Sequence, residues 1–252
     1  SAPLGRKIAI RDAELQLRVT KCCKFSVKTL TRVLSYFNFA AMDEIRFLNP
    51  NGKIEIHKHW LPHWQQGAIT YFVTWHLADS IPHEKLQQWL TEKDIWSRMH
   101  PKPWNEIIEA EYHEKFSRNI DRWLDEGMGS CLLRKHEISI DVAESINHFD
   151  GDRYIIHAFV VMPNHVHVLF QLAQAKKIET IVQSWKSYSA RKINAKMGRK
   201  GSLWQADYWD RMIRNETHFL HCKNYIQRNP AMAKLSKEEC ILYVKQLENE
   251  DS

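Results

Sequence analysis

The sequence is poor in glycine, cysteine and long apolar runs, and each scarcity excludes a class of protein. Eight glycines in 252 residues leave little room for a phosphate-binding loop, and no Walker-type motif, paired catalytic carboxylates or serine triad is present. No apolar run approaches the ~18 residues of a transmembrane helix, and the first residues lack a signal peptide's apolar stretch. Five cysteines, an odd number without a Cys-x-x-Cys pair, favour free thiols over disulfides or a cysteine-based zinc finger. We therefore expect a cytoplasmic protein with no membrane partner and no nucleotide cofactor.

Charge is distributed unevenly around the net value of +6. Residues 153–235 hold 14 Lys and Arg against 4 Asp and Glu, whereas residues 78–152 hold 9 against 16. A basic surface neutralises phosphates and gives salt-sensitive affinity for nucleic acid, although an ordinary solvated basic face is the alternative. Unpaired bases stack on aromatic rings, and several rings lie among these cations, some of which we expect in the core: Trp185, Tyr188, Trp204, Tyr208 and Trp209.

The most informative stretch is residues 160–170, Val-Val-Met-Pro-Asn-His-Val-His-Val-Leu-Phe. Strand side chains alternate between faces, so His165 and His167 are predicted to point the same way from a buried strand. Their positions differ by about 6.6 Å, which lets two imidazoles converge on one metal ion. The pattern therefore predicts half of a divalent-metal site, with a pair of surface histidines as the alternative.

A second feature follows sixty residues later. From Glu216 the apolar residues recur at helical spacing, and we expect Pro230 to end that helix. Tyr225 and Asn229 are four residues apart and so share one helix face. A tyrosine hydroxyl beside an amide oxygen, docked near two histidines, is suited to phosphoryl transfer. The alternatives are a packing role for Tyr225 and a helix C-cap role for Asn229.

These residues carry a resemblance to a known family. The chain resembles the single-tyrosine HUH transposases, most closely the REP-associated tyrosine transposases of bacteria, between about Trp64 and Leu235. The resemblance implies that His165 and His167 are metal ligands, that Tyr225 is the nucleophile and that Asn229 is the third ligand, with Mg²⁺ or Mn²⁺ as the cofactor. The motifs that carry it occur in fixed order at 162–169, 184–187, 201–205, 208–211, 213–214 and 225–230. Residues 1–60 match nothing in that family, and the acidic stretch near 84–135 is long for its smallest members.

The alternation of strands and helices predicts an α+β domain with an antiparallel sheet. The resemblance implies a ferredoxin-like sheet, the HUH palm, with flanking helices and an N-terminal extension. We expect an extension at 1–60, the transposase domain at 61–235 and a tail at 236–252. Strands are predicted at 68–77, 153–162, 166–172 and 203–210, and helices at 26–39, 84–98, 104–125, 138–149 and 177–196.

The function implied by the resemblance is metal-dependent cleavage and rejoining of single-stranded DNA through a 5′-phosphotyrosine, at hairpin-forming repetitive palindromic elements. The protein would act on single-stranded or hairpin DNA as a monomer or homodimer, in the bacterial cytoplasm near the nucleoid. A non-catalytic hairpin-binding relative, a rolling-circle replication initiator and a zinc-stabilised scaffold are the alternatives. The residues we expect to contact DNA are Lys186, Arg191, Lys192, Arg199, Lys200, Arg211, Arg214 and Arg228.

Two other groups compete for these roles. Tyr188 lies among basic residues and is the main rival nucleophile, although phosphate contact or packing would also explain it. His57 and His59 share the His-x-His spacing, but we assign them to a surface loop because no strand is predicted there. The sequence 208–211, Tyr-Trp-Asp-Arg, could bind DNA or support the site through an Asp–Arg pair.

Overall fold

The computed structural model describes residues 44–58, 62–101 and 104–246. The predicted helix at 26–39 and the residues Cys22, Cys23 and His59 lie outside these ranges. Within them, the cysteines Cys131, Cys222 and Cys240 are free thiols. None of the helices in these ranges combines the length and the apolarity needed to cross a membrane.

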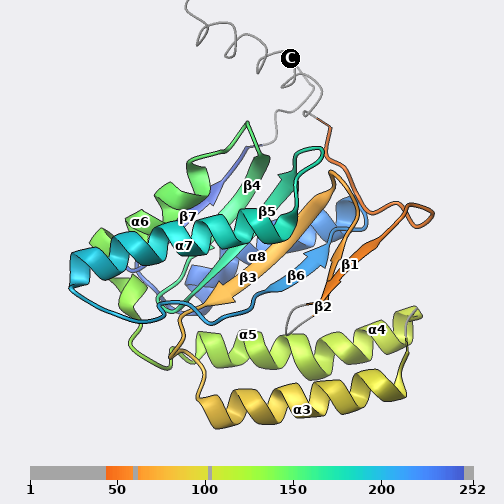
Figure 1. Ribbon diagram of the computed structural model, residues 1–252, viewed down its shortest axis with the longest axis horizontal. Coiled ribbons are helices and arrows are strands. Elements are labelled where there is room, and N and C mark those ends of the chain that lie inside the picture. Colours follow the sequence, from red (N-terminus) through yellow and green to blue (C-terminus); the bar gives the residue numbers. More distant parts are fainter. Residues whose placement is uncertain (1–43, 59–61, 102–103, 247–252) are drawn as a thin grey trace, which may run out of the picture. The chain divides into compact units, whose positions relative to one another are not determined.

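A five-stranded antiparallel sheet forms the centre of residues 44–246 (Figure 1). Its strand order is β6-β3-β5-β4-β7. Strand β6, the last strand within the basic residues 153–235, therefore lies beside β3. Helix α6 connects β3 to β4, and α7 connects β5 to β6, which is the ferredoxin-like arrangement; β7 is added at the β4 edge. The predicted fold class is therefore confirmed. The strands are β3 (Thr70–His76), β4 (Tyr154–Val161), β5 (His165–Leu172), β6 (Trp209–Met212) and β7 (Ile241–Val244).

Helices cover both faces of this sheet, so that β3, β4 and β5 are buried along their whole length. Helices α6 (His136–Asn147) and α7 (Ile178–Met197) pack on one face over a core that includes Trp75, Phe170 and Trp185. Helix α8 (Glu216–Met232) packs on the other face, behind the sheet in Figure 1, over Phe72, Val160 and Leu169. Because alternate residues of a strand serve opposite faces, the even-numbered positions of β3 and the odd-numbered positions of β5 face α8.

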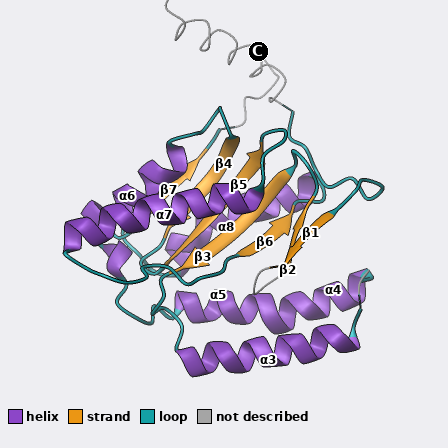
Figure 2. Ribbon diagram, in the orientation of Figure 1, coloured by secondary structure: helices purple, strands orange, loops and turns teal. Residues whose placement is uncertain are grey.

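A helical segment lies between β3 and α6 in the chain (Figure 2). Its side chains form a third apolar cluster. Trp89, Trp96 and Phe116 are its largest buried side chains. The prediction at 104–125 is confirmed as helical, but the helix contains a π-helical turn at His113–Ser117. The segment consists of α3 (His83–Met99), α4 (Glu106–Tyr112), the π-helical turn and α5 (Arg118–Asp125), and a 3-10 turn (Leu132–Arg134) leads from it to α6.

Three local predictions are wrong. The strand predicted at 203–210 is only β6, Trp209–Met212, because the preceding carbonyls bind a side chain instead of a neighbouring strand. Pro230 does not end its helix, because α8 continues to Met232. The Ala233 amide donates to the Asn229 carbonyl at 3.0 Å. His57 is not in a loop, since β1 (Glu55–Lys58) pairs with β2 (Pro62–Gln65) as a hairpin.

The chain before β1 also follows the sheet. The Leu48 amide donates to the Ile213 carbonyl, and the Thr70 amide donates to the Arg46 carbonyl, each at 2.8 Å. Backbone of residues 46–48 thus lies along the β3 and β6 edge. The domain boundaries at residues 60 and 235 stay predictions.

Candidate active site

Two histidines occupy adjacent inward positions of β5 on the face that α8 covers. His165 stands opposite His76 and His167 opposite Thr74 in the register with β3. The two imidazole centroids are 4.7 Å apart, and the side chains are 1% and 0% exposed. The prediction that both rings face the same way is confirmed, and a pair of surface histidines is excluded.

Each imidazole is held through Nδ1. His165 Nδ1 lies 2.8 Å from Asn164 Oδ1, and His167 Nδ1 lies 2.7 Å from Thr74 Oγ1. Since the amide oxygen can only accept, the proton of neutral His165 belongs on Nδ1, and its Nε2 carries a lone pair. Neither Nε2 has a hydrogen-bond partner within the described ranges. Support of a histidine through one nitrogen while the other stays unpaired is typical of metal ligands.

Burial fixes the charge state of the pair. Loss of solvent lowers the pKa of His165 well below its usual range, and the neighbouring imidazoles of His167 and His76 lower it further. Burial, with a smaller contribution from Arg211, lowers the pKa of His167 to about 3. Both rings are therefore neutral at pH 7, which is the form that binds a metal ion.

Helix α8 brings a tyrosine and an asparagine to the same face. The helix begins at an Asn215 cap, whose side-chain oxygen accepts from the His218 amide at 2.9 Å. Ten residues after this cap, the Tyr225 ring lies 5.2 Å from that of His167. Asn229 is 1% exposed. The C-cap alternative for Asn229 is wrong, because the helix continues beyond it.

The polar atoms of these two residues lack partners within the described ranges. The Tyr225 hydroxyl and both side-chain polar atoms of Asn229 are buried without a hydrogen bond of regular geometry. Burial raises the pKa of Tyr225 well above its usual value, and the negative charges of Asp121 and Asp125 on α5 add to that effect. The two side chains are near enough for Asn229 to lower the pKa of Tyr225 slightly. Buried polar groups are normally satisfied, so this concentration of unpaired atoms marks a site built for something else to bind.

The donor atoms fit a divalent cation only if the amide takes part. No group of three or more His, Cys, Asp or Glu side chains in the described ranges could hold a metal. Two imidazole nitrogens and the Asn229 oxygen make a mixed, incomplete set, suited to Mg²⁺ or Mn²⁺ with water and a phosphate oxygen as the remaining ligands.

Several supporting residues were not predicted. Thr74 and Asn164 orient the two histidines, and Asn164 also donates to the Leu124 and Met128 carbonyls at 3.0 and 3.3 Å. His76, 1% exposed, stacks on Trp209 at 5.0 Å. Asn164 could have been found from its position next to His165 in the sequence. Thr74 and His76 could not, because their places opposite His167 and His165 depend on the β3–β5 register, which the sequence does not specify.

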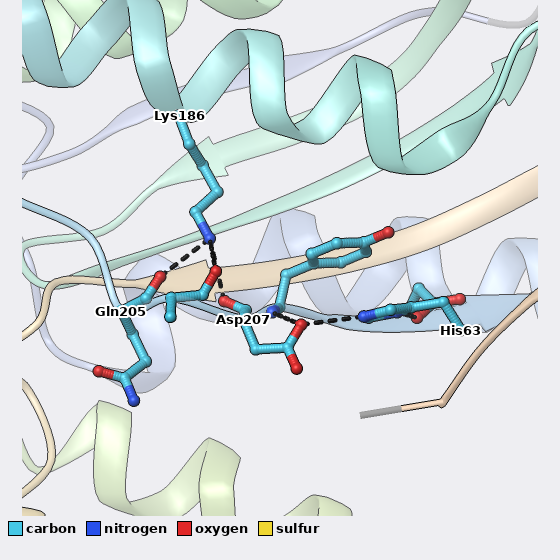
Figure 3. A network of polar contacts seen from close by, with 7 residues as sticks. His63, Lys186, Gln205 and Asp207 are labelled. Atoms are coloured by element: carbon cyan, nitrogen blue, oxygen red, sulfur yellow. Dashed lines mark hydrogen bonds and ion pairs between the residues drawn. The ribbon is translucent and has the colours of Figure 1, made fainter. Parts of the chain in front are cut away.

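A buried ionic network fixes the segment that leads into β6 (Figure 3). His63 of β2 is 2% exposed and lies between two carboxylates, with Nε2 2.9 Å from Asp207 and Nδ1 2.5 Å from Asp210. Its ring stacks on Tyr208 at 4.1 Å. The Lys186 ammonium donates to the Gln205, Ala206 and Asp207 carbonyls at 2.9, 2.8 and 3.1 Å.

This network changes the interpretation of two residues. Lys186, expected at the DNA surface, is 5% exposed and binds backbone carbonyls, so its charge supports the chain before β6. Asp210, considered as a partner of Arg211, bonds His63 instead, and Arg211 lies 4.0 Å from Asp121. Two side chains thus fix the edge of the sheet at β6: Lys186 of α7 and His63 of β2.

The network predicts a pH-dependent contribution to stability. Burial alone lowers the pKa of His63, but the hydrogen bonds and charges of Asp207 and Asp210 outweigh it and raise the pKa to about 9. Because the pKa of His63 in the folded state lies above its unfolded value of 6.5, protonated His63 stabilises the folded protein. This stabilisation is complete below pH 6.5 and is lost as the pH rises through 9. The shift corresponds to about 3 kcal/mol.

We expect the free energy of unfolding of the wild type, minus that of His63→Gln, to be constant below pH 6 and to fall by about 3 kcal/mol toward pH 10. Urea denaturation across that range measures it. Burial lowers the pKa of Lys186 to about 8, but Lys186 is present in both proteins and so cancels in the difference. A difference independent of pH would show that His63 is not charged in the folded protein.

The predicted DNA-contacting cations divide between the two faces of the sheet. Arg191, Lys192, Arg199 and Lys200 lie on α7 or directly after it, on the face opposite the histidines. Lys192 bonds Asp141 and Glu144 of α6 at 3.0 and 2.5 Å. Arg211 and Arg214 accompany β6, and Arg228 is exposed on α8. The rival nucleophile Tyr188, 45% exposed on α7, is also separated from the histidines by the sheet.

The part of the chain that contains the histidines, Tyr225 and Asn229 matches a known protein family. Residues 133–229 match the family model described as "Transposase IS200 like". This segment, a little over a third of the chain, is similar to the IS200-like transposases. It runs from the turn before α6 to Asn229 and so includes β4, β5, α7, β6 and most of α8. His165, His167, Tyr225 and Asn229 all lie within the matched segment, whereas β3 and the helical segment α3–α5 lie outside it.

Solved structures give weaker similarities. A REP-associated tyrosine transposase bound to a REP hairpin is 19% identical with a TM-score of 0.36, over 72% of this chain and 77% of that chain. A protein assigned as a transposase from Deinococcus radiodurans R1 is 16% identical with a TM-score of 0.26, over 64% and 91%. Scores of this size carry no argument about function. No curated protein matches the chain.

Proposed function

We propose that this protein cleaves and rejoins single-stranded DNA through a covalent link between Tyr225 and a 5′-phosphate. The observation that carries the proposal is the meeting of β5 and α8: two neutral histidines with unpaired Nε2 atoms, a tyrosine ring 5.2 Å from one of them, and an unpaired buried asparagine. Phosphoryl transfer requires such positioning more than it requires acid–base groups.

The division of work among the residues follows from their contacts. A divalent cation held by His165, His167 and Asn229 would polarise the scissile phosphate. The Tyr225 oxygen forms a bond to phosphorus and loses its proton to water, while the bond from phosphorus to the 3′ oxygen breaks and that oxygen leaves as a 3′-OH. Thr74 and Asn164 keep the imidazoles in the orientation that this requires. The phosphotyrosine conserves the bond, so rejoining needs no nucleotide cofactor.

The substrate we propose is a single strand beside a DNA hairpin, as the family resemblance implies. Arg211 supports contact with the phosphate next to the site, because it lines the same cavity as Thr74 and lies 5.8 Å from the Phe72 ring centroid. Arg214 lines this cavity too. We assign the DNA path to these two arginines and Arg228 rather than to the cations of α7.

A strand-specific adduct assay tests the proposal. The protein is incubated with Mn²⁺ and hairpin oligonucleotides from repetitive palindromic elements, labelled at either the 5′ or the 3′ end. A 5′-phosphotyrosine makes only the 3′-labelled fragment migrate with protein on a denaturing gel, while the 5′-labelled fragment is released with a 3′-OH. Binding without any adduct would instead support the non-catalytic hairpin-binding alternative, and an adduct on the 5′-labelled fragment would exclude the proposed polarity.

Salt dependence gives a second expectation. Affinity for the hairpin with single-stranded flanks should exceed that for a fully paired duplex of the same sequence, because stacking needs unpaired bases. The logarithm of affinity should fall linearly with the logarithm of salt, with a slope of about −0.7 for each phosphate contact. Arg214→Gln is expected to make that slope shallower by about 0.7, whereas Arg191→Gln, on the other face, leaves it unchanged. Fluorescence anisotropy between 50 and 200 mM salt (roughly the range over which such contacts weaken) measures both, and equal slopes for the two variants would contradict the assigned path.

A further inference from the structure

A cavity of about 220 Å³ lies between the helical segment α3–α5 and strand β6. This volume greatly exceeds the ~10–15 Å³ that a single water molecule needs. Aromatic rings line it from both sides: Trp89, Trp104, Tyr112 and His113 from the helical segment, and Tyr208 and Trp209 from the chain at β6. Charged residues line it as well, namely Lys93, Asp121, Asp210, Arg211 and Arg214. The π-helical turn places His113 and Ser117 on this wall, and such turns occur frequently at functional sites.

The cavity shares a wall with the candidate active site. Phe72 and Thr74 line it; Phe72 also contacts His167 and Tyr225, and Thr74 contacts His167. Thr74 bonds His167 at 2.7 Å, and the Phe72 ring lies 5.4 Å from His167 and 6.1 Å from Tyr225. A DNA strand whose phosphate reached Tyr225 would therefore lie beside Phe72, which also lines this cavity.

Unpaired polar atoms on β6 and beside it indicate that a polar ligand belongs there. The Trp209 Nε1 and the Tyr208 hydroxyl are buried without a hydrogen-bond partner in the described ranges, and both residues contribute to the lining of the cavity. The Trp209 ring is fixed by its stack on His76 at 5.0 Å and 10°, and by its edge contact with Trp89 at 6.2 Å. A buried indole N–H normally finds an acceptor, and nucleobase ring nitrogens and carbonyls are acceptors.

We infer that this cavity receives one unpaired base of the DNA strand next to the scissile phosphate. The inference rests on the proposed function and extends it. A base has two flat faces for the aromatic walls and acceptor atoms for the Trp209 N–H, and Arg211 at the cavity supplies charge for the attached phosphate. A base within a duplex could not enter, so the cavity selects single-stranded DNA at the position where cleavage occurs. The helical segment outside the transposase match thereby has a role in substrate choice.

An abasic scan combined with a Trp209 variant tests this. Each nucleotide of the unpaired stretch beside the hairpin is replaced in turn by an abasic analogue, and dissociation constants are measured for the wild type, Trp209→Leu and Trp209→Phe. A stacked base contributes ~1–3 kcal/mol, or about 5- to 150-fold in affinity. At one position the abasic analogue should reduce the affinity of the wild type by that factor. The same analogue should reduce the affinity of Trp209→Leu by less than about twofold, and that of Trp209→Phe by nearly as much as in the wild type.

Two further proteins make the result specific. Tyr188→Leu removes an exposed aromatic ring on the opposite face and should keep the full abasic effect. Trp104→Leu alters the opposite wall of the cavity and replaces Trp209→Leu if that variant fails to fold. Adduct formation with binding, but with no position where the abasic loss depends on these tryptophans, would overturn the base cavity and leave the proposed function standing. Absence of both binding and adduct with every hairpin would overturn the proposed function and the cavity together.

Discussion

Replacing Tyr225 by phenylalanine is expected to abolish the covalent protein–DNA adduct while hairpin binding changes by less than about twofold. The substitution removes one oxygen atom, and that oxygen has no hydrogen-bond partner in the described residues, so the packing against His167 and Phe72 is retained. Loss of a nucleophile can cost as much as ~10⁶-fold in rate. We expect at least a ~10³-fold loss of cleavage, measured by denaturing gels and by mass spectrometry of the adduct peptide.

Two matched variants make this assignment decisive. Tyr188→Phe removes the hydroxyl of the exposed tyrosine on α7, and Tyr243→Phe removes that of the β7 tyrosine that stacks on Phe159. Both proteins should still form the adduct. Cleavage by Tyr225→Phe, or an adduct peptide containing Tyr188, would show that the nucleophile has been assigned to the wrong residue.

Removal of either strand histidine is expected to have the second-largest effect. His165→Ala and His167→Ala each delete an imidazole from a proposed set of three protein ligands, and cleavage in Mg²⁺ or Mn²⁺ should fall below detection. The wild type in EDTA should behave in the same way. His157→Ala is the matched control, because His157 is another buried histidine of the same sheet that contacts Phe219 and belongs to no proposed ligand set.

Metal binding can be measured apart from cleavage. Mn²⁺ at a hundred times its dissociation constant should stabilise the wild type and His157→Ala by about 2.7 kcal/mol, and the two other variants much less. Thermal denaturation with and without Mn²⁺ records this difference. Equal stabilisation of all four proteins, or full cleavage by His165→Ala in EDTA, would remove the histidine pair from the site.

The sequence predicted the elements of the site better than their surroundings. Period-two alternation placed His165 and His167 on one side of a buried strand, and helical spacing put Tyr225 and Asn229 on one face, because both patterns depend only on near neighbours in the chain. That these two elements meet on the α8 face came from the family resemblance, not from periodicity. Their roles as ligands and nucleophile stay predictions.

The parts that were missed depend on distant contacts. His76 faces His165 only because β3 pairs with β5 across some ninety residues of chain, and His63 meets Asp207 and Asp210 across more than 140. The strand expected at 203–210 has suitable residues, but the Lys186 ammonium occupies the carbonyls that a ladder would use. Lys186 itself appears in the sequence as one more cation of a basic helix. Such tertiary contacts override local propensity.

The sheet order has a consequence for the speed of assembly. Strands β4 and β5 are joined by only Met162, Pro163 and Asn164, and hairpins of this kind form in about 1–10 μs. The β3–β5 pairing must close a loop that includes the whole helical segment, and non-local pairing of this type slows folding. We therefore expect the two histidines to be aligned early on a β4–β5 hairpin, with Thr74 arriving late to fix the His167 ring. Destabilising substitutions in β3 should then accelerate unfolding far more than they slow refolding.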